Sequence, residues 1–255
     1  MKQLVREFLL DTAKIGPKFG FQGLISRMRA HRMGKVTIPK VGQVCIRYGD
    51  SDFDTFRQVF RNKDYELPTS LKFIINKHYR SILDSGGRPV IIDAGANVGA
   101  ASLWFRLNYP EAAVVAVEPD PNNLIVLKKN AMSRNIKVLD AAIGSEEGFV
   151  SICNVGESWA VQTTRSDSGL KVVTIEDSLR DIDDGVLFIV KIDIEGFESD
   201  LFSRNTEWMD SACAIYMEPH DWLFPGKRTS RNFQREISCR DFEVFIRGEN
   251  LIYVR

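Results

Sequence analysis

The segment VIIDAGANVGAAS, residues 90–102, constrains the fold of this chain more than any other part of it. An apolar run ends at Asp93, a turn with Gly95 and Gly99 follows, and a helical pattern begins at residue 100. Because glycine has no Cβ, the backbone of such a turn can approach a ligand closely. The segment predicts a buried strand, a tight turn and a helix, with a nucleotide-type ligand at the carboxyl end of the strand.

The spacing within this turn narrows the choice of ligand. A dinucleotide fingerprint reads GxGxxG and places a pyrophosphate at the helix N-terminus, whereas this turn carries Asn97 and the bulky Val98. The next apolar strand, 113–118, ends at Glu118, whose carboxylate can accept hydrogen bonds from ribose hydroxyls. These features favour an adenosine ligand with a positively charged amino-acid tail. A nicotinamide-dependent oxidoreductase and a non-catalytic binding module are the alternatives.

Short apolar strands alternate with helical patterns through most of the chain. Strands are expected at 89–93, 113–118, 137–143, 186–193 and 212–218, with helices at 69–83, 100–108, 121–134 and 229–240. This alternation is typical of a parallel sheet. The last two apolar runs, FEVFIR and LIYVR, flank Gly248 and predict a hairpin. We expect an α/β, Rossmann-like fold with a mostly parallel seven-stranded sheet, helices on both faces and a C-terminal antiparallel hairpin.

Residues 1–67 are expected to form a helical and β-hairpin extension before a main domain of residues 68–255. Its first part has the spacing of an amphipathic helix broken near Gly16, and two short strands are expected within 36–48. Packing of the apolar helix face on the main domain is the simplest role. A homodimer arm, a lid and a membrane-surface contact are the alternatives.

Composition limits the partners. The 34 basic and 34 acidic residues give a formal net charge of zero, and no basic stripe with interleaved aromatics is present, so nucleic acid is not expected. No apolar run reaches the ~20 residues of a membrane span, and the N-terminus lacks a signal-peptide pattern. The cysteines form no CxxC pair, which argues against zinc and disulfides. The four cysteines, which lie far apart in the sequence, fit a reducing setting, so a soluble, cytoplasmic protein is expected. They are Cys45, Cys153, Cys213 and Cys239.

Several blocks resemble the FkbM-type methyltransferases, which belong to the Rossmann-like, class I, S-adenosylmethionine-dependent superfamily. The blocks are IIDAGANVGAASLWF, VAVEPDPNNLIVLKKN, AAIG and IVKIDIEGFESDLF, preceded by the similar stretch DFDTFRQVFRNKDYE. The resemblance runs from about residue 46 to 220. It implies O-methylation of a hydroxyl on a sugar, glycolipid or polyketide-type small molecule, with N-methylation as the alternative.

The resemblance also implies roles for residues of the cofactor site. Asp93, Gly95 and Asn97 would face the methionine part of S-adenosylmethionine, and Glu118 its ribose. Residues 119–120 would shape the ribose pocket and residues 140–142 would lie near adenine. The cofactor-binding set implied in this way is Asp93, Gly95, Ala96, Asn97, Gly99, Glu118, Pro119, Asp120, Asp140, Ala141 and Ala142.

Two strand ends carry the side chains expected to act on the acceptor. The first gives Asp193, a candidate to bind or deprotonate the hydroxyl, followed by Glu195 and Glu198 as candidates to bind substrate. Glu198 can alternatively cap the helix that follows. The second strand end gives Glu218 and His220, whose imidazole suits a general base.

A metal ion is an alternative role for part of this set. Asp193, Glu218 and His220 together offer ligands suited to Mg²⁺ or Mn²⁺. A long polar loop is expected over 154–169, with Trp159 as a candidate to stack on adenine or on a sugar face of the substrate, or to pin the loop to the core. His220 is preferred over His31 and His78, which lie away from strand ends.

Overall fold

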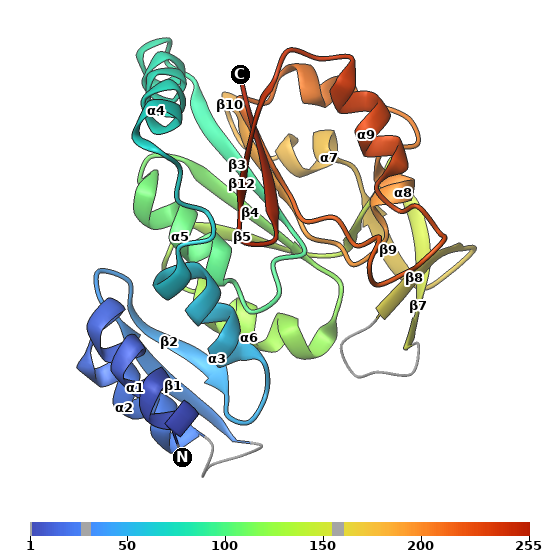
Figure 1. Ribbon diagram of the computed structural model, residues 1–255. Helices are drawn as coiled ribbons and strands as arrows, with labels where there is room; N and C mark the ends of the chain where they lie inside the picture. The colour runs from blue at the N-terminus through green and yellow to red at the C-terminus, as the bar shows by residue number, and fades with distance from the viewer. Residues whose placement is uncertain (1, 27–31, 155–160) are drawn as a thin grey trace.

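The computed structural model describes residues 2–26, 32–154 and 161–255 (Figure 1). Its centre is a seven-stranded sheet in which β13 (Asn250–Val254) runs antiparallel to both of its neighbours. The five strands from β11 onward in the sheet order are parallel to one another. The predicted fold class is confirmed. The full order is β12 (Glu243–Arg247), β13, β11 (Ala214–Met217), β10 (Gly185–Ile192), β3 (Arg88–Ala94), β4 (Ala113–Glu118) and β5 (Ile136–Asp140).

Helices cover both faces of this sheet (Figure 1). Along β3, Ile91 packs with one hydrophobic cluster, while Val90 and Ile92 pack with another, because successive strand residues point to opposite faces. One face carries α4 (Thr69–Asp84), α5 (Ala100–Asn108) and α6 (Pro121–Ala131). The other face carries α7 (Ile175–Leu179), α8 (Glu198–Leu201), α9 (Arg231–Ser238) and a 3₁₀ helix, η2 (Glu207–Asp210).

A second, four-stranded sheet differs from the expectation in two places. The expected strand at 137–143 is divided, since Ala142–Ile143 forms β6 and pairs with β9 (Leu170–Val173). The predicted loop at 154–169 is wrong over Val161–Ser166, which forms β8 and pairs with β7 (Gly148–Asn154). The sequence VQTTRS of β8 lacks an apolar alternation, so only backbone pairing with β7 identifies it. Trp159 lies outside the described residues.

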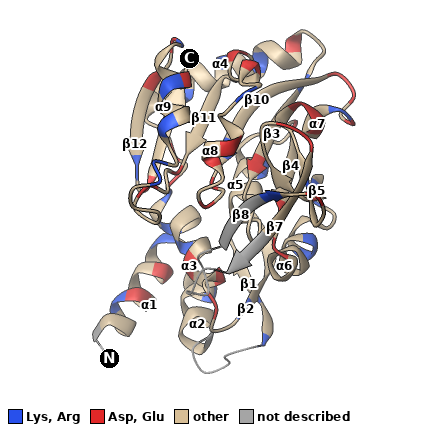
Figure 2. Cartoon of the chain, turned by 90° about the vertical axis from the view of Figure 1, so that its right-hand side faces the viewer, with Lys and Arg blue, Asp and Glu red and all other residues tan. Residues whose placement is uncertain are grey.

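The N-terminal extension packs against the main domain. It contains α1 (Lys2–Lys14), α2 (Pro17–Ser26), β1 (Met33–Ile38), β2 (Gly42–Arg47), α3 (Asp52–Phe56) and a π-helix, η1 (Arg57–Asn62). Acidic and basic residues are interspersed along α1 (Figure 2). Phe19 and Phe56 share one hydrophobic cluster with Phe105 of α5. Within the described ranges, no helix combines the length and the apolar character needed to cross a membrane.

One buried side chain joins the extension to the main domain. Asn130 of α6 accepts a hydrogen bond from the backbone N of Cys45 in β2 at 2.6 Å and donates to its carbonyl at 3.1 Å. The same amide donates to the carbonyl of Val98 in the glycine turn at 2.8 Å. The extension and the turn are therefore fixed to each other through α6. The boundary near residue 67 stays a prediction.

Candidate cofactor and acceptor site

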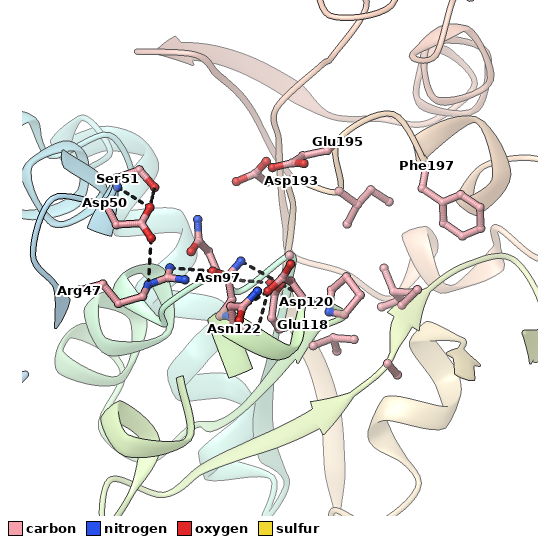
Figure 3. A pocket seen from close by; sticks show the side chains of 18 of the residues that line it. Arg47, Asp50, Ser51, Asn97, Glu118, Asp120, Asn122, Asp193, Glu195 and Phe197 are labelled. Carbon is pink, nitrogen blue, oxygen red and sulfur yellow. Dashed lines mark hydrogen bonds and ion pairs between the residues drawn. The ribbon is translucent and has the colours of Figure 1, made fainter. Parts of the chain in front are cut away.

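A cavity of about 690 Å³ opens where β3, β4, β5 and β10 end (Figure 3). This volume lies within the range of cavities that bind cofactor-sized ligands. Its wall contains most of the residues expected to hold the cofactor, and it brings together turns that are distant in the sequence. Among the expected residues on its wall are Gly95, Asn97, Glu118, Pro119, Asp120, Ala141, Ala142, Asp193 and Glu195.

The glycine turn lies directly against the end of β10. Gly95 has φ +75°, and a Cβ added there would lie 1.7 Å from the carbonyl oxygen of Asp193. Asn97 has φ +50°, a conformation that asparagine tolerates better than most residues. The backbone N–H groups of Gly95 and Ala96 both donate to the carbonyl of Val117 at 3.0 Å. The turn is thus held by β4 on one side and by the Asp193 backbone on the other.

Glu118 is buried, and its carboxylate accepts hydrogen bonds from three neighbouring groups. One carboxylate oxygen accepts from the backbone N of Asn97 at 2.7 Å, and the other accepts from Asp120 N at 3.0 Å and Asn123 Nδ2 at 3.2 Å. Burial raises the pKa of Glu118, while these hydrogen bonds oppose that rise. A carboxylate offers about four acceptor positions, so about one remains for a ribose hydroxyl. Binding both hydroxyls would require Asn123 to move.

Asp93 does not face the cavity as expected but lies beneath the turn. Its carboxylate accepts a hydrogen bond from Ser102, and Oδ1 lies 3.3 Å from Nζ of Lys191. Lys191 also lies 3.3 Å from Asp193 Oδ2 and donates to the carbonyl of Gly95 at 2.7 Å. Burial alone would lower the pKa of Lys191, but the charges of Asp193 and Asp93 raise it. The ammonium of Lys191 therefore stabilises Asp93 and holds the turn.

Three other expected cofactor residues also lie away from this wall. Gly99 is the N-cap of α5, with φ +87°, and a Cβ there would lie 2.7 Å from Leu127 Cδ1, so this glycine serves helix packing. The Asp140 side chain is more than half exposed and lies 3.7 Å from Lys128 Nζ. Ala96 lines a neighbouring cavity instead.

The extension contributes a wall of the cavity that the sequence did not indicate. Arg47 ends β2, Asp50 and Ser51 follow it, and all three line the cavity (Figure 3). The guanidinium of Arg47 lies 2.6 Å from the buried Asp52 carboxylate and donates to Asn123 Oδ1 at 2.8 Å. No local motif marks these residues, because their place depends on how β2 packs on α6.

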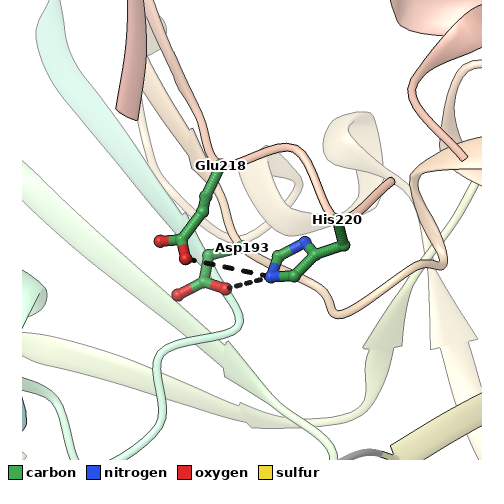
Figure 4. Close-up of side chains that lie close together, drawn as sticks. All are labelled: Asp193, Glu218 and His220. Carbon is green, nitrogen blue, oxygen red and sulfur yellow. Dashed lines mark ion pairs between the residues drawn. The ribbon is translucent and has the colours of Figure 1, made fainter. Parts of the chain in front are cut away.

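A second cavity, of about 200 Å³, adjoins the first and shares Gly95, Asn97, Asp193 and Glu195 with it. It leads to the other predicted acceptor residues. His220 Nε2 lies 3.5 Å from Asp193 Oδ1 and 3.9 Å from Glu218 Oε1 (Figure 4). The structure thus brings together the ends of β10 and β11, as expected for neighbouring parallel strands.

Glu198 lies behind His220 rather than on a cavity wall, contrary to its expected contact with substrate. It is fully buried, begins α8, and its Oε1 lies 2.8 Å from His220 Nδ1. No side-chain capping bond is found at this end of α8. The contact with Nδ1 leaves Nε2 of the imidazole to face Asp193 and Glu218. Glu198 therefore positions the imidazole.

The cluster binds protons more tightly than isolated groups do. Burial alone would lower the pKa of His220, but the hydrogen bond to Glu198 and the charges of Glu198 and Asp193 raise it to about 9. Burial and the charge of Asp193 raise the pKa of Glu218 to about 8. The neighbouring carboxylates thus stabilise the positive charge of a protonated His220.

The same cluster has the donor set predicted for a metal ion. One ligand atom from each of Asp193, Glu218 and His220 lies within 4.8 Å of the others. Two carboxylate oxygens and an imidazole nitrogen suit Mg²⁺ or Mn²⁺, and a buried carboxylate on the second imidazole nitrogen is common behind metal-binding histidines. The residues fit such an ion, and the metal site stays a prediction.

Comparison with known proteins places the chain in a family. The model of the methyltransferase FkbM domain matches residues 93–223, slightly more than half of the chain. Methyltransferase sdnD of Sordaria araneosa is 35% identical over 85 residues, which are 32% of this chain and 33% of that protein. Methyltransferase 1 of Beauveria bassiana is 28% identical over 65 residues, 24% of this chain and 26% of that protein. These matches span a third or less of the curated relatives' length.

Solved methyltransferase structures resemble this chain at lower sequence identity. A Bacillus cereus O-methyltransferase in complex with SAH has 14% identity and a TM-score of 0.39, over 79% of this chain and 91% of that one. The SAH-bound Podospora anserina methyltransferase PaMTH1 has 10% identity and a TM-score of 0.41, over 79% and 84%. Likenesses of this size carry no information about the acceptor.

Proposed function

The chain belongs to the FkbM family of S-adenosylmethionine-dependent methyltransferases, and we propose that it methylates a hydroxyl group of a sugar, glycolipid or polyketide-type small molecule. The observation that carries this proposal is the pair of adjoining cavities. The larger one has the residues of a nucleoside site, and the smaller one leads from the shared Asp193 to His220 and Glu218.

The walls of the larger cavity suit the three parts of S-adenosylmethionine. The turn at Gly95 and Asn97 would hold the methionine part, and Glu118 would accept a ribose hydroxyl. Apolar side chains at the far end, those of Ala142, Ile143 and Phe197, would contact adenine. When bound, S-adenosylmethionine supplies an electrophilic methyl group on a sulfonium.

The acceptor hydroxyl would lie between the two cavities, beside Asp193. Asp193 would hold the hydroxyl so that its oxygen lone pair could bond to the methyl carbon that the cofactor supplies, while the electron pair of the broken carbon–sulfur bond would stay with sulfur. The hydroxyl proton passes to the cluster of Asp193, Glu218 and His220. Nε2 is the imidazole nitrogen that faces the acceptor, because Nδ1 is bonded to Glu198, and it receives the proton only in molecules whose His220 is neutral, a fraction that grows as the pH rises toward 9.

A divalent cation on the same cluster is the alternative that its geometry favours. Mg²⁺ or Mn²⁺ on Asp193, Glu218 and His220 would bind the acceptor oxygen and lower the pKa of its hydroxyl. The test is turnover after EDTA treatment and after adding back each metal. Loss and recovery would support the ion, whereas full activity in EDTA would leave proton transfer to the side chains.

N-methylation is the alternative, because the residues of the cofactor cavity would bind S-adenosylmethionine in the same way for an oxygen or a nitrogen acceptor. Nuclear magnetic resonance of the methylated product would locate the methyl group on oxygen or nitrogen.

Calorimetric titration with S-adenosylhomocysteine tests the cofactor site. Glu118→Gln should weaken binding about tenfold or more, because the variant loses charge-assisted hydrogen bonds at the turn. Asp140→Asn is the matched control, since Asp140 is the register partner of Glu118 at the end of the next strand but its side chain is exposed. NADH is the control ligand. Binding of NADH alone would overturn the proposal in favour of an oxidoreductase.

The cellular location and the partners of the protein are proposals as well. We propose a cytoplasmic location, supported by the free thiols of Cys45, Cys213 and Cys239. A small-molecule or glycan acceptor, rather than nucleic acid, is supported by the zero net charge. The exposed side chains of Val5 and Leu9 on α1 support a membrane-surface or homodimer contact.

A further inference from the structure

Resting on the proposed function, we propose that the smaller cavity is the acceptor subsite and that its outer end binds an ammonium group. The acceptor would then be an amino sugar or amino alcohol, held by its ammonium at the outer end while a hydroxyl reaches Asp193 at the inner end.

The wall of the smaller cavity is strongly acidic. Five carboxylates line it against two cationic side chains. Both cations belong to the inner end, where Lys191 is held by Asp93 and Asp193, and His220 by Glu198. Neither of these two cations forms an ion pair with Asp64 or Glu249. The five are Asp64, Asp193, Glu195, Glu218 and Glu249.

Two of these carboxylates meet at the outer end. A Cβ added to Gly248, in the turn between β12 and β13, would lie 3.0 Å from the carboxyl carbon of Asp64, so this side chain rests on the hairpin turn. Burial and the neighbouring charge of Glu249 raise the pKa of Asp64, with Arg247 opposing the rise. Among the described residues, neither Asp64 nor Glu249 has a cationic partner within ion-pair distance. Such a pair favours a cationic ligand.

A buried amide beside this pair also lacks a partner. Asn250 is 3% exposed and lines the same cavity, and its side-chain Oδ1 accepts no hydrogen bond from the described residues. Buried polar atoms without partners are uncommon, and this one, on a cavity wall, can accept a hydrogen bond from a ligand. An ammonium has three N–H donors, and Asp64, Glu249 and Asn250 together offer it three acceptor groups.

The rim is suited to the same ligand. Trp222 lines the cavity and is 64% exposed, so its ring can cover a sugar face or lie over a cation. Acceptors with a carboxylate or phosphate would instead face the acidic wall, which disfavours them. An amine bound as ammonium has no lone pair, so methylation would occur on the hydroxyl at the inner end.

Matched acceptors test this inference. Glucosamine, galactosamine and mannosamine, their N-acetyl forms and the corresponding uronic acids would be titrated into protein saturated with S-adenosylhomocysteine. At least one amine should bind about tenfold or more tighter than its N-acetyl and acid forms, a preference typical of hydrogen bonds to charged groups. Methyl transfer from S-adenosylmethionine, followed as S-adenosylhomocysteine formation, should show the same order.

Variants connect the preference to these side chains. Asp64→Asn and Glu249→Gln should each reduce the preference for the amine severalfold, and retained S-adenosylhomocysteine binding would show that each is folded. Glu243→Gln is the control, because Glu243 is an exposed carboxylate on the same hairpin. The ammonium subsite is overturned if no amine is preferred, or if the preference survives both variants. Failure of the wild-type protein to bind S-adenosylhomocysteine would instead overturn the proposed function, and with it this inference.

Discussion

Replacing Lys191 by Met should destabilise the protein through Asp93. The two side chains are 3% and 0% exposed, and Nζ lies 3.3 Å from Oδ1. Without the ammonium, Asp93 keeps the hydrogen bond from Ser102 but has no opposite charge, and removing one member of a buried ion pair costs about 3–5 kcal/mol. Asp193 also loses a partner, but it is 29% exposed and can be hydrated.

A variant that combines Lys191→Met with Asp93→Asn shows whether the loss of stability arises from the ion pair between these two side chains. Asp93→Asn alone should cost less, about 1–3 kcal/mol, because Lys191 keeps Asp193 and the Gly95 carbonyl as partners. With both substitutions the buried charge is absent, so the loss should be about 2 kcal/mol and well below the sum of the single losses.

Urea unfolding followed by circular dichroism measures these free energies. Lys137→Met is the control, because Lys137 pairs with Asp181 on the surface, and it should leave the free energy of unfolding nearly unchanged. Additive losses in the double variant, or a loss under about 1 kcal/mol in Lys191→Met, would refute the assigned role of Lys191.

Three further predictions concern the turn, the imidazole and the extension. Gly95→Ala should abolish S-adenosylhomocysteine binding, since its Cβ would overlap the Asp193 carbonyl at 1.7 Å, and calorimetry showing wild-type affinity would contradict this. Glu198→Gln should lower kcat about 10- to 100-fold while S-adenosylhomocysteine binding persists, because it alters only the support of His220; unchanged kcat would exclude the positioning role. Asn130→Ala should lower the free energy of unfolding by about 2–4 kcal/mol in urea, because it removes three hydrogen bonds and leaves Cys45 N unpaired; a loss below about 1 kcal/mol would mean that Asn130 does not tie β2 to the turn.

Much of the fold could be predicted because its signals are local. The helix expected at 100–108 and the strand at 113–118 have the observed bounds, since each combines a clear period with a break at both ends. The C-terminal hairpin forms around Gly248 as expected. The strand β8 escaped prediction because its polar sequence has no such period.

Part of the cofactor cavity could also be predicted, because strand ends are local features of the sequence. Glu118 and Gly95 lie at strand ends, and a parallel sheet gathers such ends at one edge. Asp93 is also at a strand end, but the sequence does not tell whether it faces a ligand or a buried cation. That depends on the pairing of β3 with β10, which places Lys191 beside Asp93.

The sequence by itself determined the alternation of strands and helices, the glycine turn and the types of side chain at each strand end. Only the tertiary structure decided which of them meet. It placed Arg47 on the cofactor cavity, Glu198 behind His220, and Asp64 beside the turn that precedes Asn250. The physical reason is that period and turn chemistry act over a few residues, whereas these contacts join segments brought together by strand pairing and core packing.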